Sequence, residues 1–145
     1  MKPNQISKLI CYLTLTSSLF LFGCATTPVP TEQATLAPMD RIINKSYLEK
    51  QKGTGEVIVK RDAGIGGSGC TSRVYVNATA VADIWSSEKV ILFLPEGDYI
   101  IGAEPNFICS GGLSETNASI TAGKRLVFRI GYGSNGDYRI LPTAF

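Results

Sequence analysis

Short apolar runs of three to five residues repeat along the chain from Gly53 to Phe145. They are rich in β-branched and aromatic residues, and glycine, proline, asparagine and serine separate them. Such a pattern is typical of strands joined by turns, and no helical segment interrupts it. We therefore expect an all-β domain over 53–145, a small antiparallel β-sandwich of seven to eight strands, with a small barrel as the alternative. The runs are 57–59, 74–76, 80–82, 90–94, 99–101, 118–121, 126–130 and 138–140.

Two of these runs differ in how their apolar residues are spaced. The run 90–94 is apolar at every position, which predicts a central strand covered on both faces. In the run 126–130, extended to Tyr132, the even-numbered positions are apolar while Arg129 and Gly131 fall on the other face. This period of two predicts a half-buried strand with one face on the core.

The first 23 residues have a different pattern. Lys2 and Lys8 precede an apolar run over 9–22, and no acidic residue occurs in this stretch. The run is too short to cross a hydrocarbon core of about 30 Å as a helix of about 20 residues. The order of charge and hydrophobicity therefore predicts a cleaved signal peptide over 1–23.

Leu21-Phe22-Gly23-Cys24 ends the apolar run with a small residue immediately before a cysteine. These four residues resemble the lipobox of bacterial lipoproteins. The resemblance implies cleavage after Gly23 and acylation of Cys24, which would attach the protein stably to a membrane through two or three acyl chains. Ala25 stands where an aspartate would favour the inner membrane, so the resemblance implies an outer-membrane lipoprotein facing the periplasm. The alternative is an ordinary cleaved signal with a coincidental cysteine.

Two segments connect the expected anchor to the strand-rich region. Residues 24–38 hold three prolines, several threonines and one charged residue, Glu32. We expect a solvated tether that holds the domain on the order of 40 Å from the lipid head groups, at about 3.1 Å per residue. Apolar residues in 39–52 fall near helical spacing, which predicts either a short amphipathic helix or an irregular arm laid over the sheet.

One predicted hairpin carries a second resemblance. The segment Leu94-Pro95-Glu96-Gly97-Asp98-Tyr99-Ile100-Ile101, preceded by Arg73-Val74-Tyr75-Val76-Asn77, is similar to the strand, turn and strand of PEGA-type and related transthyretin-like sandwich modules. Several of these modules occur in bacterial lipoproteins. The resemblance covers 73–104 and implies a sandwich fold. It implies little about function, because sandwiches host many unrelated activities.

Four cysteines are present, of which Cys11 leaves with the signal and Cys24 takes the lipid. Cys70 and Cys109 remain, both beside glycines and in a compartment that permits disulfides. A bridge between them closes a loop of about 40 residues, worth roughly 4 kcal/mol in the chain-entropy model. The alternative is a redox or metal-binding pair, which the absence of histidine and of a Cys-x-x-Cys motif disfavours.

Residues that would carry enzyme chemistry are scarce. The chain has no histidine, which excludes the Ser-His-Asp and Cys-His arrangements and removes the commonest metal ligand. Glu96 and Asp98 are candidate acids, but they flank Gly97 in a predicted turn, where acids are common for local reasons. The stretch 64–69 matches a dinucleotide fingerprint but leads into a strand rather than a helix, so we interpret it as a loop. We therefore expect no catalytic residue, no metal site and no cofactor.

The charge balance argues against nucleic-acid binding. Removal of Lys2 and Lys8 with the signal leaves twelve basic and twelve acidic residues, and no basic patch indicates nucleic-acid binding. We expect a non-enzymatic envelope protein, anchored to the membrane at Cys24, that binds another envelope protein or has a structural role there. The alternative is a small-ligand-binding or hydrolase-inhibitor module. The expected surfaces are the loops 63–69 and 105–115, and the aromatic residues at strand ends either form a contact patch or cap the core: Trp85, Phe107, Tyr132 and Tyr138.

Overall fold

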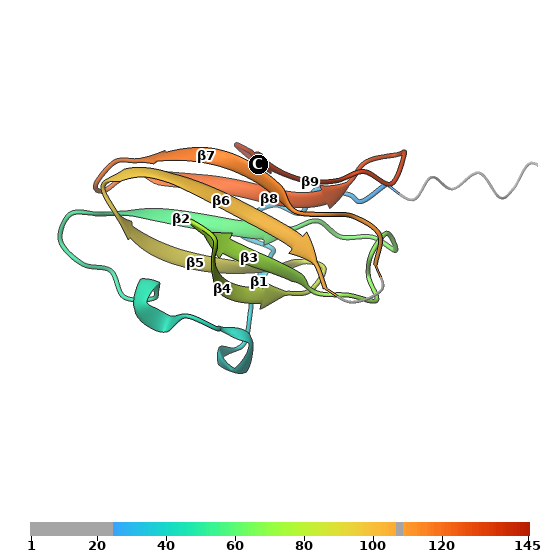
Figure 1. Cartoon of the computed structure of the whole chain (residues 1–145), viewed down its shortest axis with the longest axis horizontal. Helices are drawn as coiled ribbons and strands as arrows, with labels where there is room; N and C mark the ends of the chain where they lie inside the picture. The colour runs from blue at the N-terminus through green and yellow to red at the C-terminus, as the bar shows by residue number, and fades with distance from the viewer. Residues whose placement is uncertain (1–24, 107–108) are drawn as a thin grey trace, which may run out of the picture.

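The computed structural model describes residues 25–106 and 109–145, and within them nine strands form two sheets packed face to face (Figure 1). The all-β sandwich expected from the sequence is confirmed. The predicted signal peptide, the lipobox and Cys24 lie outside the described residues, as does Phe107.

All eight apolar runs lie in strands, and a ninth strand precedes them. The larger sheet has the order β1-β5-β2-β8-β9 and the smaller sheet the order β4-β3-β6-β7. The strands are β1 (Thr35–Leu36), β2 (Thr54–Arg61), β3 (Ser72–Val76), β4 (Thr79–Ile84), β5 (Glu88–Pro95), β6 (Gly97–Pro105), β7 (Ser114–Ile120), β8 (Arg125–Tyr132) and β9 (Tyr138–Pro142).

The strand directions correct one part of the prediction. Hairpin neighbours pair antiparallel, as expected, but β2 and β8 run parallel, with Val57 opposite Leu126. β1 also runs parallel to β5. Parallel neighbours need a long connection between them, and β2 and β8 are separated by the whole smaller sheet. Because no turn joins them, no local signal in the sequence sets their direction.

The core lies between the sheets and follows the alternation of the strands. Val57 and Val59 of β2 and Val74 and Val76 of β3 belong to one core cluster, and all four are almost fully buried. Each such side chain stabilises the fold by about 1.5–3 kcal/mol relative to exposure. In β8 the buried positions Phe128, Ile130 and Tyr132 confirm the predicted period of two.

The apolar run in β5 is covered on both faces, but not as a central strand of the sheet. Its even-numbered positions, among them Leu92, are buried in the core, whereas Ile91 and Phe93 lie half-buried on the outer face. β5 lies between β1 and β2, second from the edge of the larger sheet. The residues that cover its outer face come from the segment before β2.

The expected solvated tether is wrong for the described residues from Ala25 to Pro38. Thr27 forms a two-way β-bridge with Ala63, with N···O distances of 2.7 and 2.9 Å. Further along, Thr31 and Ala34 are buried, and β1 extends the larger sheet. Low hydrophobicity suggested disorder, but short threonine and alanine side chains also allow an extended chain to lie close on a sheet and satisfy its backbone there. The folded domain therefore includes residues before Gly53.

The segment 39–52 is the irregular arm, not the helix. It contains two single 3₁₀ turns, η2 (Met39–Arg41) and η3 (Lys45–Tyr47), and runs along the edge of the sandwich where β4 and β5 lie, before it enters β2 (Figure 1). Buried Ile42 bridges to Ala82 of β4, which leaves too short a free stretch to close a helix. Arg41 fixes the arm to β5 through two contacts of 2.6 Å with the Glu88 carboxylate.

Candidate functional site

One end of the sandwich gathers the long connections. β2, β6 and β8 all end there, so that the segments 62–71 and 133–137 lie beside the connection that follows β6, and the described chain also starts there (Figure 1). The short β4–β5 turn at 85–87 joins them, because Ser87 N donates to Arg61 O at 3.1 Å. We call this region the loop end and the opposite one the turn end.

The predicted disulfide is confirmed and lies at the loop end. Cys70 and Cys109 are joined with an S–S distance of 2.04 Å and a Cα–Cα distance of 6.2 Å. The bridge connects the glycine-rich loop that precedes β3 to the connection that follows β6. The two loops chosen from the sequence as interaction surfaces are therefore brought together, as expected from their position beside the cysteines.

Buried Arg61 fixes the glycine-rich loop from inside. Arg61 is the last residue of β2, and its side chain lies on the face of β2 that faces the core. Its guanidinium donates to the carbonyl oxygens of Cys70 and Gly67. Burial lowers the pKa of Arg61, and the nearby Tyr138 and Tyr132 oppose that shift. A Cβ on Gly67 would lie 2.3 Å from the Tyr132 ring, so glycine is needed there for close packing. The stretch 64–69 is thus a loop that leads into β3, as the sequence predicted.

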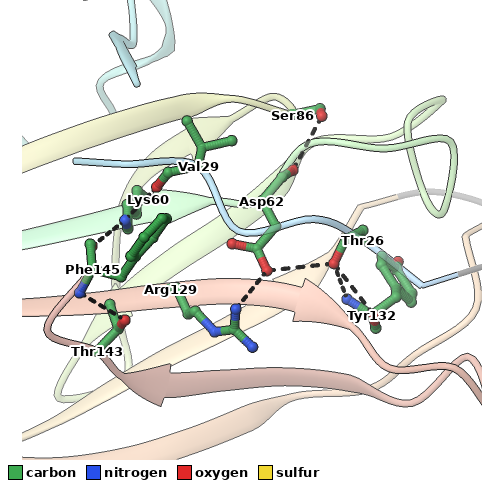
Figure 2. A network of polar contacts seen from close by, with 9 residues as sticks. All are labelled: Thr26, Val29, Lys60, Asp62, Ser86, Arg129, Tyr132, Thr143 and Phe145. Carbon is green, nitrogen blue, oxygen red and sulfur yellow. Dashed lines mark hydrogen bonds and ion pairs between the residues drawn. The ribbon is translucent and has the colours of Figure 1, made fainter. Parts of the chain in front are cut away.

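A polar cleft of about 390 Å³ lies beside this loop, on the outer face of β8 and β9. Asp62 forms part of its wall and is only 2% exposed. Figure 2 shows its carboxylate reaching Arg129, with Asp62 Oδ2 3.4 Å from Arg129 Nη1 and 3.5 Å from Thr26 Oγ1. Asp62 Oδ1 is buried without a hydrogen-bond partner among the described residues. Burial raises the pKa of Asp62, and the charges of Arg129 and Lys60 oppose this shift.

The rim of the cleft carries a second ion pair. Arg139 Nε lies 2.6 Å from Asp137 Oδ2, and both side chains are exposed. Gly131 lies against Asp62 and Thr26, and no larger residue fits there, because a Cβ would lie 2.5 Å from Asp62 Oδ2 and 2.7 Å from Thr26 Oγ1. The cleft therefore offers two guanidinium groups and two carboxylates, one of each at the rim and one of each deeper.

Lys60 ties both ends of the described chain to the same outer face. It is fully buried, and its ammonium donates to the main-chain oxygens of Val29 and Phe145 (Figure 2). The Phe145 ring lies over it, with the centroid 5.3 Å from Nζ. Burial lowers the pKa of Lys60, while Asp62 and Glu32 oppose the shift.

An apolar groove of about 250 Å³ lies between the arm and β5. Its rim is strongly exposed, with Leu36 63% and Met39 56% accessible. Its wall is apolar apart from one lysine and consists of Ala37, Ile42, Leu48, Lys89, Val90, Ile91 and Phe93. Such a groove accepts an aliphatic or aromatic side chain rather than a charged one.

The candidate acids from the sequence lie at the turn end, far from the cleft along the strands. Glu96 Oε2 accepts from Ala122 N at 3.2 Å, and Asp98 Oδ1 accepts from Ser119 Oγ at 2.7 Å. Both acids lie in the hairpin, as predicted, but their contacts join it to β7 and to the turn that follows β7 rather than acting within the turn itself. Asp98 lines a shallow pocket with Asn77 and Asn117, and no polar residue that lines it is buried in the part of the chain that the structure describes.

The aromatic candidates separate into two groups. Tyr132 and Tyr138 are buried and pack edge to face with centroids 5.1 Å apart, so they cap the core. Trp85 is 39% exposed in the β4–β5 turn at the loop end. A single contact patch of these aromatics is therefore not formed by the described residues.

Sequence reasoning missed Asp62 and Arg129. One signal was present in the sequence, the three successive charged residues Lys60-Arg61-Asp62 at the end of an apolar strand. This strand, β2, is the central strand of the larger sheet, and both of its faces are covered. Such a run requires partners from elsewhere in the chain. The docking of Thr26 beside Asp62 had no comparable signal, since it depends on the unexpected position of the N-terminal segment.

No helix among the described residues is long and apolar enough to cross a membrane, and they contain no cluster of three or more metal-ligating His, Cys, Asp or Glu side chains. No protein-family model matches the chain, and no curated protein matches it either. The resemblances of the N-terminus to a lipobox and of 73–104 to PEGA-type modules accordingly stay predictions.

Proposed function

We propose that this protein is a non-enzymatic envelope lipoprotein, anchored at Cys24 to the outer membrane on its periplasmic side, that binds another envelope protein. The anchor rests on the resemblance of residues 21–24 to a lipobox. The described chain is compatible with it, because Ala25 is exposed and the first docked residue is Thr26. The protein's own chemistry is then recognition rather than turnover.

The apolar groove between the arm and β5 supports the protein-binding role, and its exposed rim is the observation that carries it. Leu36 and Met39 present apolar area that the fold leaves uncovered. The arm beside it holds Arg41 and three lysines against two acidic residues in 39–52. A partner segment with an apolar anchor side chain and acidic flanks fits both features.

Photo-crosslinking in intact cells tests this proposal. A photoreactive residue at position 39 of the full-length lipidated protein is expected to capture one discrete envelope protein, and the same residue at exposed Lys124 of the turn end is not. Leu36→Asp, which changes a mostly exposed side chain, should abolish the capture while the melting temperature stays within a few degrees. Equal capture at positions 39 and 124, or capture that survives Leu36→Asp, would contradict a specific groove.

A second candidate function, small-ligand binding, is favoured by the cleft. Asp62 Oδ1 is buried without a partner, and Arg129 and Arg139 stand nearby. A zwitterionic solute would give a donor to the carboxylate and an acceptor to the guanidinium groups. Dipeptides are a suitable first probe: a thermal shift that disappears in Arg139→Gln and persists in Arg125→Gln, an exposed arginine outside the cleft, would favour this function over the first.

A further inference from the structure

The N-terminal attachment leaves almost no chain between the proposed anchor and the folded domain. Thr26 N donates to Tyr132 O at 3.0 Å, and Thr27 exchanges two backbone hydrogen bonds with Ala63. Only Ala25 stands between Thr26 and Cys24. Two residues span at most about 7 Å, so an acylated Cys24 would hold the loop end close to the lipid head groups instead of on the order of 40 Å away.

The loop end displays apolar residues that the core does not use. Ile65 is 92% exposed at the tip of the disulfide-linked loop, and Trp85 is 39% exposed in the neighbouring turn. The two segments are adjacent, because Ser86 Oγ donates to Asp62 O at 3.1 Å. Tryptophan is the side chain most typical of a membrane interface, since its ring is apolar and its N–H is polar.

The charges beside these residues suit a phosphate-rich surface. Arg139 is exposed and Arg129 half-exposed on the outer face next to the loop end. Each has one carboxylate neighbour, Asp137 and Asp62 respectively, and retains guanidinium N–H groups beyond that single short contact. Guanidinium groups bind phosphate with two parallel hydrogen bonds.

From these three features we infer that the loop end of the sandwich rests on the same membrane that holds the anchor, with Ile65 and Trp85 at head-group level and Arg129 and Arg139 facing lipid phosphates. The inference rests on the proposed lipid anchor. It assigns the disulfide-linked loop to the bilayer rather than to a protein partner. It leaves the apolar groove, on the flank of the sandwich, accessible from the periplasm.

Trp85 makes this orientation measurable, because it is the only tryptophan in the chain. The full-length lipidated protein is reconstituted in vesicles of phosphatidylethanolamine and phosphatidylglycerol, with and without phospholipid brominated on its acyl chains near the glycerol. We expect a blue shift of the Trp85 emission on reconstitution and a loss of emission with the brominated lipid. Ile65→Asp, at an exposed loop tip, should reduce that loss without changing how the protein floats with vesicles.

The matched control moves the reporter to the turn end. In Trp85→Phe with Ala122→Trp, an exposed position in the β7–β8 turn, brominated lipid should leave the emission unchanged. If the protein floats with vesicles but Trp85 is not quenched, or both reporters are quenched equally, the orientation is wrong and the lipoprotein proposal stands. If the protein does not float and carries no acyl mass on Cys24, the anchor proposal fails and the orientation fails with it.

Discussion

The two ends of the sandwich connect their strands in different ways. At the turn end Asn77 and Ala78 make a two-residue turn with positive φ at both positions, and Gly97 and Gly123 also adopt positive φ. At the loop end the connections that follow β2 and β6 are longer, and they are held by a disulfide and a buried guanidinium. The turn residues reverse the chain through their own backbone conformation, whereas the long loops are fixed by covalent and buried contacts between segments.

The carboxylates at the two ends also differ in how they are buried and hydrogen-bonded. Glu96 and Asp98 at the turn end accept from neighbouring backbone or side-chain donors and stay exposed. Asp62 at the loop end is buried, with one oxygen unpartnered among the described residues. At an exposed acid, water can satisfy the oxygens that make no protein contact. A buried acid at a junction of three segments depends on all of them, so such sites are where a binding function is expected.

The largest expected effect is loss of the disulfide. Replacement of both Cys70 and Cys109 by serine should lower the free energy of unfolding by about 4 kcal/mol, because the reduced chain regains the entropy of a loop of about 40 residues. Denaturant titration of the two forms measures this. A loss below about 1 kcal/mol would mean that the other loop-end contacts hold the two loops without the bridge.

Arg61→Leu comes next. The substitution leaves the carbonyl groups of Gly67 and Cys70 without their buried donor, and we expect a loss of about 2–3 kcal/mol in the free energy of unfolding. Arg125→Leu is the matched control, because its ion pair with Glu56 at 3.2 Å is exposed and worth less than about 1 kcal/mol. If the two variants lost equal free energy of unfolding, buried Arg61 would contribute no more to stability than exposed Arg125.

Glu88→Gln should cost about 1 kcal/mol at neutral pH, since the carboxylate holds the arm through Arg41. Burial alone would raise the pKa of Glu88, but the hydrogen bonds from Arg41 and from Trp85 N–H, with the charge of Arg41, bring it below its usual value. The stabilisation is therefore present above the ordinary glutamate range and is lost as pH falls through the lowered pKa. Unfolding measured between pH 7 and pH 3 should show this loss in the wild type and not in Glu88→Gln.

Asp62 should show the opposite sign. Burial raises its pKa in the folded protein, so the folded state binds the proton more tightly than the unfolded chain does. The free energy of unfolding should therefore decrease as pH rises from the ordinary aspartate range through the raised pKa. Asp62→Asn is expected to remove this decrease, and an unchanged pH profile in that variant would show that Asp62 is not its source.

The smallest effect is expected at the turn end. Asp98→Asn keeps an acceptor for Ser119 Oγ on an exposed side chain, so the free energy of unfolding should change by less than about 0.5 kcal/mol. The same denaturant titration measures it. A change as large as that of Arg61→Leu would show that the turn end depends on tertiary contacts as strongly as the loop end.

The sequence alone determined the strands and the bridge. Eight apolar runs separated by turn residues predicted seven to eight strands, because alternation and turn chemistry act within a few neighbouring residues. Cys70 and Cys109 were identified as a pair because the predicted signal peptide and lipobox account for the other two cysteines. The helix-or-arm alternative for 39–52 stayed open, since a helical spacing without a cap does not decide between them.

The tertiary structure decided what the distant segments do. The parallel pairing of β2 with β8, the docking of residues 26–36 on the larger sheet and the contact of Thr26 and Arg129 with Asp62 all join residues far apart in the sequence. Backbone hydrogen bonds between such segments are available to almost any extended sequence, so composition does not reveal them. The cleft and the short path from Cys24 to the domain follow from these pairings, and for that reason they became visible only in the folded chain.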